Sequence, residues 1–383
     1  MTESKKSKLG QFYTTNYKHI LQNLTIPESE TCIIEPFAGA GHLLNFLDDS
    51  KWSNSNSNSN SKYTIEAYDI DPKNDNIVKR DTLNSPPEYS NKFVLTNPPY
   101  LARNKSNTKS LFDKYKTNDL YKCFIKQLIL DPCNGGIIII PLNFWCSIRK
   151  ADIELRRDFL KIYNIITVNI FEEQVFEDTG YTTCSFLFVN NNTNFLFVNN
   201  NTNNENNKLD LELKLENNNK YIDVYVFGLK NSKTHLNIEL NSENNYTFGG
   251  HIYNLEQCEK IQIERLTHKN KNNENITNIL LKCIDDSAKN KICLSITKDS
   301  ERYIDNSPNL SARSYATLII SPKLNHEQQL KLVELFNSYL AVERQKYHSL
   351  FLTNYRENGR KRISFSLAFE IINYLIKLHK LDS

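Results

Sequence analysis

The residues with the clearest chemical potential lie at 97–100, where the chain reads Asn97-Pro98-Pro99-Tyr100. Proline fixes the backbone angle φ and removes an N–H donor, so Pro98 and Pro99 keep this segment stiff and leave its carbonyl oxygens as acceptors. Asn97 adds a side-chain carbonyl oxygen, and Tyr100 adds a flat aromatic face. A rigid pair of acceptors beside an aromatic ring suits a planar ligand that donates hydrogen bonds through an NH₂ group.

The element that positions this segment is a predicted strand. The apolar run Phe93–Leu95 comes directly before it and indicates the end of a buried strand. Residues 97–100 would then lie at the carboxyl end of that strand, where open α/β sheets bind their ligands. We expect a further buried strand over Ile137–Ile140, and the alternating segment Tyr221–Phe227 as the last strand of the same sheet.

A second candidate segment, Glu35–Gly41, joins a short predicted strand to an apolar helix start. Gly39 and Gly41 allow a sharp turn and let a ligand approach the backbone closely. The loop lacks the third glycine of a dinucleotide-binding fingerprint, so it is weak evidence for NAD. Small-residue turns between a strand and a helix also occur in many α/β proteins without a ligand.

Acidic residues follow the next predicted strand. The strand Tyr63–Tyr68 ends in Asp69-Ile70-Asp71-Pro72. A carboxylate at the tip of a second strand can accept both hydroxyls of a ribose. We favour Asp69 for this role because Asp71 precedes a proline and is expected to begin a turn. Asp81 is a third acidic position ahead of Asn97.

Composition and charge limit the class of protein. The chain has 383 residues, of which 39% are hydrophobic, and its net charge is +3, so affinity for a polyanion must come from a local patch. It has no long apolar run, and Met1–Gly10 lacks the apolar core of a signal peptide, so we expect a soluble, intracellular, cytoplasmic protein, away from membranes. Its eight cysteines form no C-x-x-C pair, which favours a reducing compartment and argues against a metal site.

The sequence pattern changes from about residue 241. A basic segment, Glu343–Arg362, lies within this second part of the chain. Six basic residues against two acidic ones give this segment a charge of +4, more than the +3 of the whole chain. Basic residues interleaved with tyrosines suit contacts to phosphates and base edges, although charge runs are often only solvated surface. Predicted helices at 328–341 and 367–378 flank the segment. The candidate DNA-binding residues are Arg344, Lys346, Tyr355, Arg356, Arg360, Lys361 and Arg362.

Taken together, these motifs resemble the series found in DNA adenine-N6 methyltransferases of restriction-modification systems and large DNA viruses. The matching segments, in order, are Gly10–Thr14, Glu35–Gly41, Asp69–Pro72, Asp81 and Asn97–Tyr100. The order is similar to the gamma arrangement, with the target-recognition domain at the C-terminal end. The resemblance implies a Rossmann-like α/β methyltransferase sheet with helices on both faces over residues 1–240, and an α+β target-recognition domain over 241–383.

The resemblance also implies a reaction and a set of site residues. A methyl group would pass from S-adenosylmethionine to the N6 amine of an adenine flipped out of double-stranded DNA. The glycine loop would hold the methionine part of the cofactor, Asp69 the ribose and Asp81 the adenine amine. The implied cofactor-binding residues are Phe12, Tyr13, Thr14, Glu35, Pro36, Phe37, Ala38, Gly39, Gly41, Asp69, Ile70, Asp81 and Phe124. The implied catalytic residues are Asn97, Pro98, Pro99, Tyr100 and Phe188. Phe124 has an equally plausible role as a core aromatic.

The placement of Phe188, the implied second aromatic wall for the flipped base, depends on a duplication. The nine residues Phe186–Asn194 are repeated without change as Phe195–Asn203. We favour Phe188 because it is continuous with the preceding segment 181–185, and Phe197 of the second copy is the alternative.

Three other interpretations remain open at this point. Asn-Pro-Pro-Tyr is also found in methyltransferases that act on RNA guanine amines or on glutamine amides of proteins. A DNA-binding module with a decayed methyltransferase half would keep the basic segment without the activity, although the intact Asn97, Asp69 and glycine loop speak against it. A partner restriction endonuclease on a separate chain is compatible with the first interpretation.

Overall fold

The computed structural model describes residues 13–47, 62–147, 149–176, 182–193, 221–227, 232–237, 239–240, 246–247, 261–286, 291–306, 314–346, 352–354 and 360–382. The chain divides into two compact units. The first comprises Met1–Lys233 and Leu240–Tyr246, and the second comprises Thr234–Glu239 and Thr247–Ser383.

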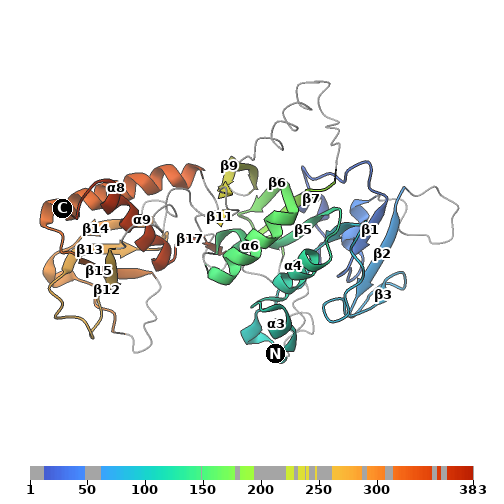
Figure 1. The fold of residues 1–383 in the computed structure, drawn as a ribbon, viewed down its shortest axis with the longest axis horizontal. Coiled ribbons are helices and arrows are strands. Elements are labelled where there is room, and N and C mark those ends of the chain that lie inside the picture. Colours follow the sequence, from blue (N-terminus) through green and yellow to red (C-terminus); the bar gives the residue numbers. More distant parts are fainter. Residues whose placement is uncertain are drawn as a thin grey trace, which may run out of the picture. The chain divides into compact units, whose positions relative to one another are not determined.

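A nine-stranded sheet has the order β3-β2-β1-β4-β5-β7-β6-β8-β9 (Figure 1), in which β1 to β8 belong to the first unit and most of β9 belongs to the second. Its strands are β1 (Cys32–Glu35), β2 (Thr64–Asp69), β3 (Val78–Lys79), β4 (Phe93–Thr96), β5 (Gly135–Pro141), β6 (Tyr163–Phe171), β7 (Thr183–Asn190), β8 (Tyr221–Phe227) and β9 (Ser232–Asn237). Strands β1 to β5 run parallel, and β7 is antiparallel to both of its neighbours. The strand order reverses between β1 and β4, which places a ligand crevice at their carboxyl ends. Strand β8 was expected to be last, but β9 follows it at the edge.

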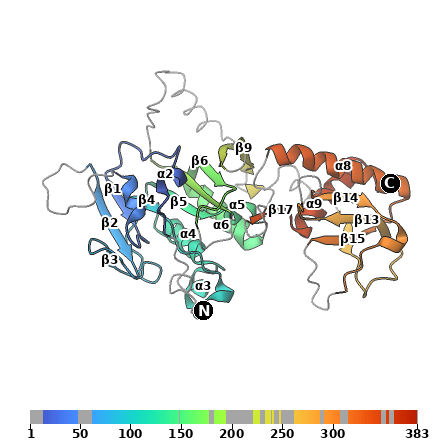
Figure 2. The same ribbon diagram turned by 180° about the vertical axis from the view of Figure 1, so that it is seen from behind.

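Both faces of this sheet are covered because successive side chains of a strand point to opposite sides. On one face, α2 (Tyr17–Ile20) and the 3-10 helix η1 (His42–Phe46) pack Ile20 and Leu43 against Ile137 and Ile139. On the other, Phe159 of α6 (Lys150–Ile162) packs against Phe186, beside α4 (Leu120–Leu130). Figure 1 shows α4 and α6 in front of the sheet. Figure 2, in which the molecule is seen from behind, shows α2. The expected Rossmann-like sheet with helices on both faces is confirmed.

Strand β7 contains part of the first copy of the duplicated segment. The first copy supplies Phe186–Asn190 to this strand, and Phe186, Leu187 and Phe188 are at most 2% exposed. The second copy, including Phe197, lies outside the described residues.

The second unit is built on an antiparallel sheet in the order β12-β15-β13-β14. Its strands are β12 (Gln262–Arg265), β13 (Ile276–Lys282), β14 (Cys293–Ile296) and β15 (Tyr315–Ser321). Two helices accompany them, α8 (His326–Lys346) and α9 (Phe365–Leu378), and the Ser364 hydroxyl caps the start of α9. The short strands β16 (Leu352–Asn354) and β17 (Arg360–Arg362) form a hairpin between the helices in sequence. The remaining short elements of the two units are α3 (Ser110–Tyr115), α5 (Asn143–Cys146), β10 (Glu239–Leu240), β11 (Tyr246–Thr247) and the 3-10 helices η2 (Arg103–Lys105) and η4 (Asp299–Glu301). In the described part of the chain, no helix combines the length and apolarity needed to cross a membrane.

Candidate functional site

The amide of Asn97 lies directly after β4 and is held at both ends. Its Nδ2 atom donates to Thr14 Oγ1 at 3.0 Å, and its Oδ1 atom accepts from the Tyr100 hydroxyl at 2.5 Å. Asn97 is 9% exposed, so these bonds fix the direction of a nearly buried amide. The contact between Thr14 and Asn97 carried no signal in the sequence, because 83 positions separate the two residues.

Tyr100 is more buried than a simple stacking platform would need to be. Its hydroxyl also lies 2.8 Å from the carbonyl oxygen of Ile139, and only 7% of the residue is exposed. Burial raises the pKa of Tyr100 well above its usual value, so the hydroxyl stays protonated and available as a donor. The ring meets Tyr121 edge-on, with centroids 6.1 Å apart. Tyr100 therefore orients Asn97, a role that the sequence did not indicate.

A small, partly open hollow lies beside Asn97. It is lined by Tyr13, Thr14, Glu35, Phe37, Ala38, His42, Leu43 and Asn97. The lining joins the predicted catalytic amide to the predicted glycine loop and N-terminal segment. His42 and Leu43 were not among the residues selected from the sequence. Phe12 lies outside the described residues.

Glu35 is the buried acid of this hollow. It is 1% exposed, and its Oε1 atom accepts from the Thr96 hydroxyl at 2.5 Å and from the Phe37 backbone N–H at 3.3 Å. Its Oε2 atom is buried without a hydrogen-bond partner among the described residues. Burial raises the pKa of Glu35 to about 8, although the Thr96 and Phe37 hydrogen bonds oppose the shift. A ligand with a cationic group would supply the missing partner, which fits the ammonium of S-adenosylmethionine.

The glycine loop is braced by Asp69. Gly39 and Gly41 adopt left-handed φ angles of +57° and +82°, which favour glycine. The Oδ2 atom of Asp69 accepts from the Gly39 N–H at 2.8 Å, and its Oδ1 atom accepts from the Asp71 N–H at 2.7 Å. Each carboxylate oxygen can accept more than one hydrogen bond, so Asp69 retains capacity for ribose hydroxyls. Ile70 beside it is 42% exposed.

Two other predicted cofactor residues lie behind or beside the loop. Phe124 is fully buried and meets Phe37 edge-on at 5.1 Å, so it supports Phe37 from the core. Asp81 accepts from the backbone N–H and side-chain amide of Asn84 at 3.2 and 2.7 Å. Its neighbour Thr82 donates to the Pro36 carbonyl at 2.8 Å, which ties this segment to the glycine loop.

The structure does not bring Phe188 to Asn97. Phe188 pairs with Gly136 near the amino end of β5, whereas Asn97 follows the carboxyl end of β4. The ring is fully buried between Phe159 and Tyr163, with centroids at 5.2 and 4.9 Å. The sequence did not reveal the direction of β7 across the sheet, so an aromatic residue of the core was selected as a wall of the site.

The connection between β6 and β7 does reach the edge of the sheet where β4 and β5 end and Asn97 lies. Thr183, the first residue of β7, pairs with Pro141, the last residue of β5. Within the described part of this connection, Phe176 is the aromatic residue, and it is 5% exposed. It packs in a cluster with Ile20 and Leu21 beside α2.

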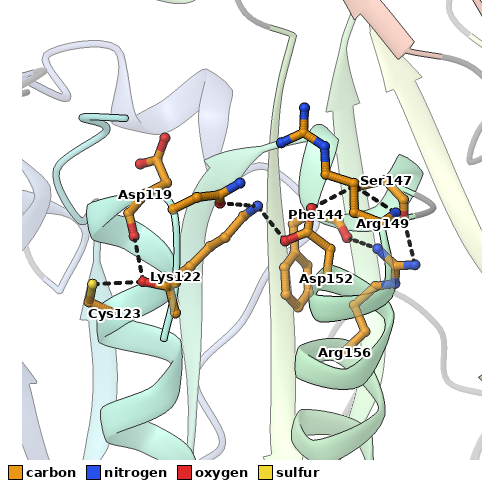
Figure 3. A network of polar contacts seen from close by, with 10 residues as sticks. Asp119, Lys122, Cys123, Phe144, Ser147, Arg149, Asp152 and Arg156 are labelled. Carbon is orange, nitrogen blue, oxygen red and sulfur yellow. Dashed lines mark hydrogen bonds and ion pairs between the residues drawn. The ribbon is translucent and has the colours of Figure 1, made fainter. Parts of the chain in front are cut away.

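A buried polar network anchors the segment that follows Tyr100 (Figure 3). Leu101 accepts a backbone hydrogen bond from Leu120 at 3.2 Å, which joins it to the start of α4. Lys122 of α4 is 3% exposed and donates to Asp152 of α6 at 2.6 Å, and Ser147 donates to the other oxygen of Asp152 at 2.6 Å. Burial alone would raise the pKa of Asp152, but the Lys122 ammonium and the Ser147 hydroxyl lower it below its usual value. The sequence gave no sign of this pair, because charged helical residues are usually exposed.

The predicted DNA-binding residues have different surroundings in the second unit. Arg344 forms an ion pair with Asp285, and the two side chains are only 16% and 17% exposed. Lys361 and Arg362 are partly exposed on β17; the Lys361 carbonyl accepts from the Asp285 N–H, and the N–H of Ile363, just after β17, donates to the Cys283 carbonyl. For Lys346 and Arg360 only the backbone is described, and Tyr355 and Arg356 lie outside the described residues. No cluster that could hold a metal ion occurs among the residues that the structure describes.

Comparison with protein families gives a match in the first part of the chain. Residues 9–176 match the Eco57I restriction-modification methylase family. The expected resemblance to restriction-modification methyltransferases is therefore confirmed over this methylase region. The match contains Asn97, the glycine loop and Asp69, and ends before Phe188. No curated protein matches the chain.

Several solved structures resemble the chain at low sequence identity. One is the modification subunit ascribed to a type I restriction enzyme of Vibrio vulnificus YJ016, with 13% identity and a TM-score of 0.38 over 65% of this chain and 62% of that one. Another is the M protein of the type I restriction enzyme EcoKI, with 16% identity and a TM-score of 0.36 over 97% of this chain and 72% of that one. A type I methyltransferase subunit from Streptococcus thermophilus gives 16% identity and a TM-score of 0.34, over 63% of this chain and 51% of that one. The chain thus spans less than two thirds of the Vibrio vulnificus and Streptococcus thermophilus subunits.

Proposed function

We propose that this protein is a site-specific DNA methyltransferase that transfers a methyl group from S-adenosylmethionine to the N6 amine of an adenine flipped out of double-stranded DNA. The observation that carries the proposal is the Asn97 amide. It is fixed by Thr14 and Tyr100 at the carboxyl end of β4, and it lines the same hollow as the buried acid Glu35. The match of residues 9–176 to a restriction-modification methylase family supports it.

The first task of the site is to prepare a poor nucleophile. The lone pair of an adenine amine is delocalised into the ring. If Asn97 Oδ1 and the Pro98 carbonyl each accept one N6 hydrogen, the nitrogen becomes more tetrahedral and its lone pair becomes available. Oδ1 already accepts from Tyr100, and a carbonyl oxygen has two lone pairs, so the second bond is possible. Orientation of this kind can lower a barrier by ~7–11 kcal/mol.

The cofactor would be held by residues that already meet around the hollow. Glu35 would take the ammonium, Asp69 the ribose hydroxyls and Asp81 the adenine amine, with Phe37 supported from behind by Phe124. S-Adenosylmethionine, when bound, supplies an electrophilic methyl group on a sulfonium centre. Tyr13 lies against Gly39 and would close this side of the site.

The target base needs a pocket that compensates for its removal from the duplex. Extrusion costs a few kcal/mol, and stacking on an aromatic ring contributes ~1–3 kcal/mol per base. Tyr100 would provide one wall. The second wall would come from the β6–β7 connection, because this connection reaches the edge where Asn97 lies and Phe188 does not.

The second unit would act as the target-recognition domain, with Lys361 and Arg362 on the β16–β17 hairpin facing DNA phosphates. A restriction endonuclease on a separate chain would be the natural partner of such an enzyme. Both would act inside the cell, where the DNA is.

The test is to express the protein in a host that lacks adenine methylation and to sequence its DNA by a method that detects N6-methyladenine. We expect modified adenines in one short motif, and none with Asn97→Ala. Transfer of label from radiolabelled S-adenosylmethionine to RNA or protein instead of DNA would redirect the assignment to the related substrate classes. Unmodified DNA from a folded protein that binds the cofactor would overturn the DNA proposal.

A further inference from the structure

Two buried polar atoms of the hollow lack partners among the described residues. They are Oε2 of Glu35 and Nδ1 of His42. A buried polar atom without a hydrogen bond is costly, so native structures satisfy nearly all of them. Both residues line the hollow beside Asn97, which makes a bound ligand the common source of the two missing partners.

The local chain geometry explains why His42 lies there. Gly41 adopts a φ of +82° and turns the chain into η1, of which His42 is the first residue. The next two residues, Leu43 and Leu44, are 4% and 0% exposed and anchor η1 in the core. The imidazole ring meets Tyr13 edge-on, with centroids 6.1 Å apart. His42 is therefore held between the glycine loop and the N-terminal segment.

The two atoms have opposite hydrogen-bonding character. Among the eight residues that line the hollow, Glu35 is the one carboxyl group and His42 is the one side chain that can carry a positive charge. A carboxylate oxygen accepts hydrogen bonds, whereas an imidazole N–H donates them. The ligand group that satisfies both atoms is a zwitterion with an ammonium and a carboxylate on neighbouring atoms, such as the α-amino acid end of a metabolite.

We propose that His42 binds the carboxylate of the methionine part of S-adenosylmethionine, while Glu35 binds its ammonium. The proposal rests on the proposed function, which supplies the cofactor, and adds a binding residue that the sequence motifs did not select. Asp69 does not line this hollow, so the ribose would lie outside the His42 subsite.

The test compares two ligands that differ only in the carboxylate. Isothermal calorimetry would measure the binding of S-adenosylmethionine and of decarboxylated S-adenosylmethionine to the full chain, to His42→Ala and to His42→Gln. The loss of a hydrogen bond to a charged group predicts about 10- to 100-fold weaker binding of S-adenosylmethionine by His42→Ala. Binding of the decarboxylated ligand should stay unchanged, and His42→Gln, which keeps a donor, should fall between. His326→Ala is the matched control, because His326 is an exposed residue at the start of α8.

The outcomes separate this inference from the proposed function. An equal loss for both ligands would mean that His42 only shapes the loop, and unchanged binding of S-adenosylmethionine would mean that it makes no contact. Either result overturns the His42 assignment while the cofactor assignment stands. If the unaltered protein binds neither ligand, the proposed function itself fails, and His42 with it. The melting temperature of each variant without ligand shows whether it is folded, and His42→Gln serves as the decisive variant if His42→Ala is not.

Discussion

The hydroxyl of Tyr100 lies 2.5 Å from Oδ1 of Asn97, the atom proposed to accept a hydrogen from the target amine. The same hydroxyl lies 2.8 Å from the carbonyl of Ile139 in β5, so the tyrosine links the amide to the neighbouring strand. An aromatic expected only to stack on the base thus also sets the direction of the catalytic amide. The two roles can be separated, because phenylalanine keeps the ring and removes the hydroxyl.

Tyr100→Phe should reduce the rate of methyl transfer while leaving cofactor affinity unchanged. A typical intramolecular hydrogen bond contributes about 0.5–1.5 kcal/mol, which corresponds to a rate loss of roughly 2- to 10-fold if it acts only on the amide. Single-turnover transfer of labelled methyl groups to DNA would measure it. Tyr121→Phe is the control, since the buried Tyr121 hydroxyl has no partner among the described residues and its ring packs beside Tyr100. Equal losses in the two variants would contradict an orienting role for the Tyr100 hydroxyl.

The raised pKa of Glu35 predicts that the stability of the fold favours the protonated side chain, whereas binding of the cofactor ammonium favours the charged one. Burial raises this pKa from 4.5 to about 8. Between these pH values the folded state keeps a proton that the unfolded state has lost, so the free energy of unfolding should fall as pH rises from about 4.5 to about 8. Glu35→Gln should remove this part of the pH dependence and be relatively more stable at pH 8, yet bind S-adenosylmethionine more weakly. Thermal unfolding across this pH range, with calorimetry at pH 8, checks both parts, and an unchanged pH profile would argue against a buried protonated Glu35.

Gly39 should tolerate no side chain without loss of function. Its φ of +57° disfavours any residue with a Cβ, and an added Cβ would lie 2.9 Å from Cε1 of Tyr13. Gly39→Ala should lower the free energy of unfolding by about 1–2 kcal/mol, the cost of the left-handed conformation, and weaken cofactor binding. Urea unfolding and calorimetry would measure the two effects. Adding Tyr13→Ala removes the contact but keeps the φ cost, so the double variant should remain destabilised.

The sequence predicted the parts of the site that depend on the chain order of strands and loops. Glu35 and Asp69 are the last residues of the parallel strands β1 and β2, and Asn97 directly follows β4; the carboxyl ends of such strands meet at one edge. Phe188 shows where such reasoning ends. The sequence around Phe188 does not show that β7 runs antiparallel to β5, and this direction places Phe188 at the opposite end of β5. The contacts of Thr14 and His42 could not be predicted from the sequence either, because they depend on how the N-terminal segment folds back over the glycine loop.

The Lys122–Asp152 pair should be a strong determinant of stability. The pair is buried and hydrogen-bonded, with an N–O distance of 2.6 Å, and it joins α4 to α6 (Figure 3). Lys122→Met leaves a buried carboxylate without its cation, which should lower the free energy of unfolding by about 3–5 kcal/mol. The double variant Lys122→Met with Asp152→Leu should recover much of this loss, because neither charge of the pair is then left buried without the other. Urea unfolding of the two variants and of Lys122→Met at low pH would measure the effect, and additive losses would contradict a direct pairing.

Arg344 and Lys361 should respond differently to substitution, although both belong to the basic segment. Arg344 is paired with the half-buried Asp285, so Arg344→Ala should mainly destabilise the second unit. Lys361 is partly exposed on β17, and Lys361→Ala should weaken binding of duplex DNA by a similar factor for all sequences while leaving the melting temperature close to that of the unaltered protein. The dependence of log affinity on log salt concentration should also become shallower by about 1, as expected for one lost phosphate contact. Fluorescence anisotropy at several salt concentrations would measure this slope. A slope that stays the same would remove Lys361 from the DNA interface and leave the basic segment as a structural part of its own unit.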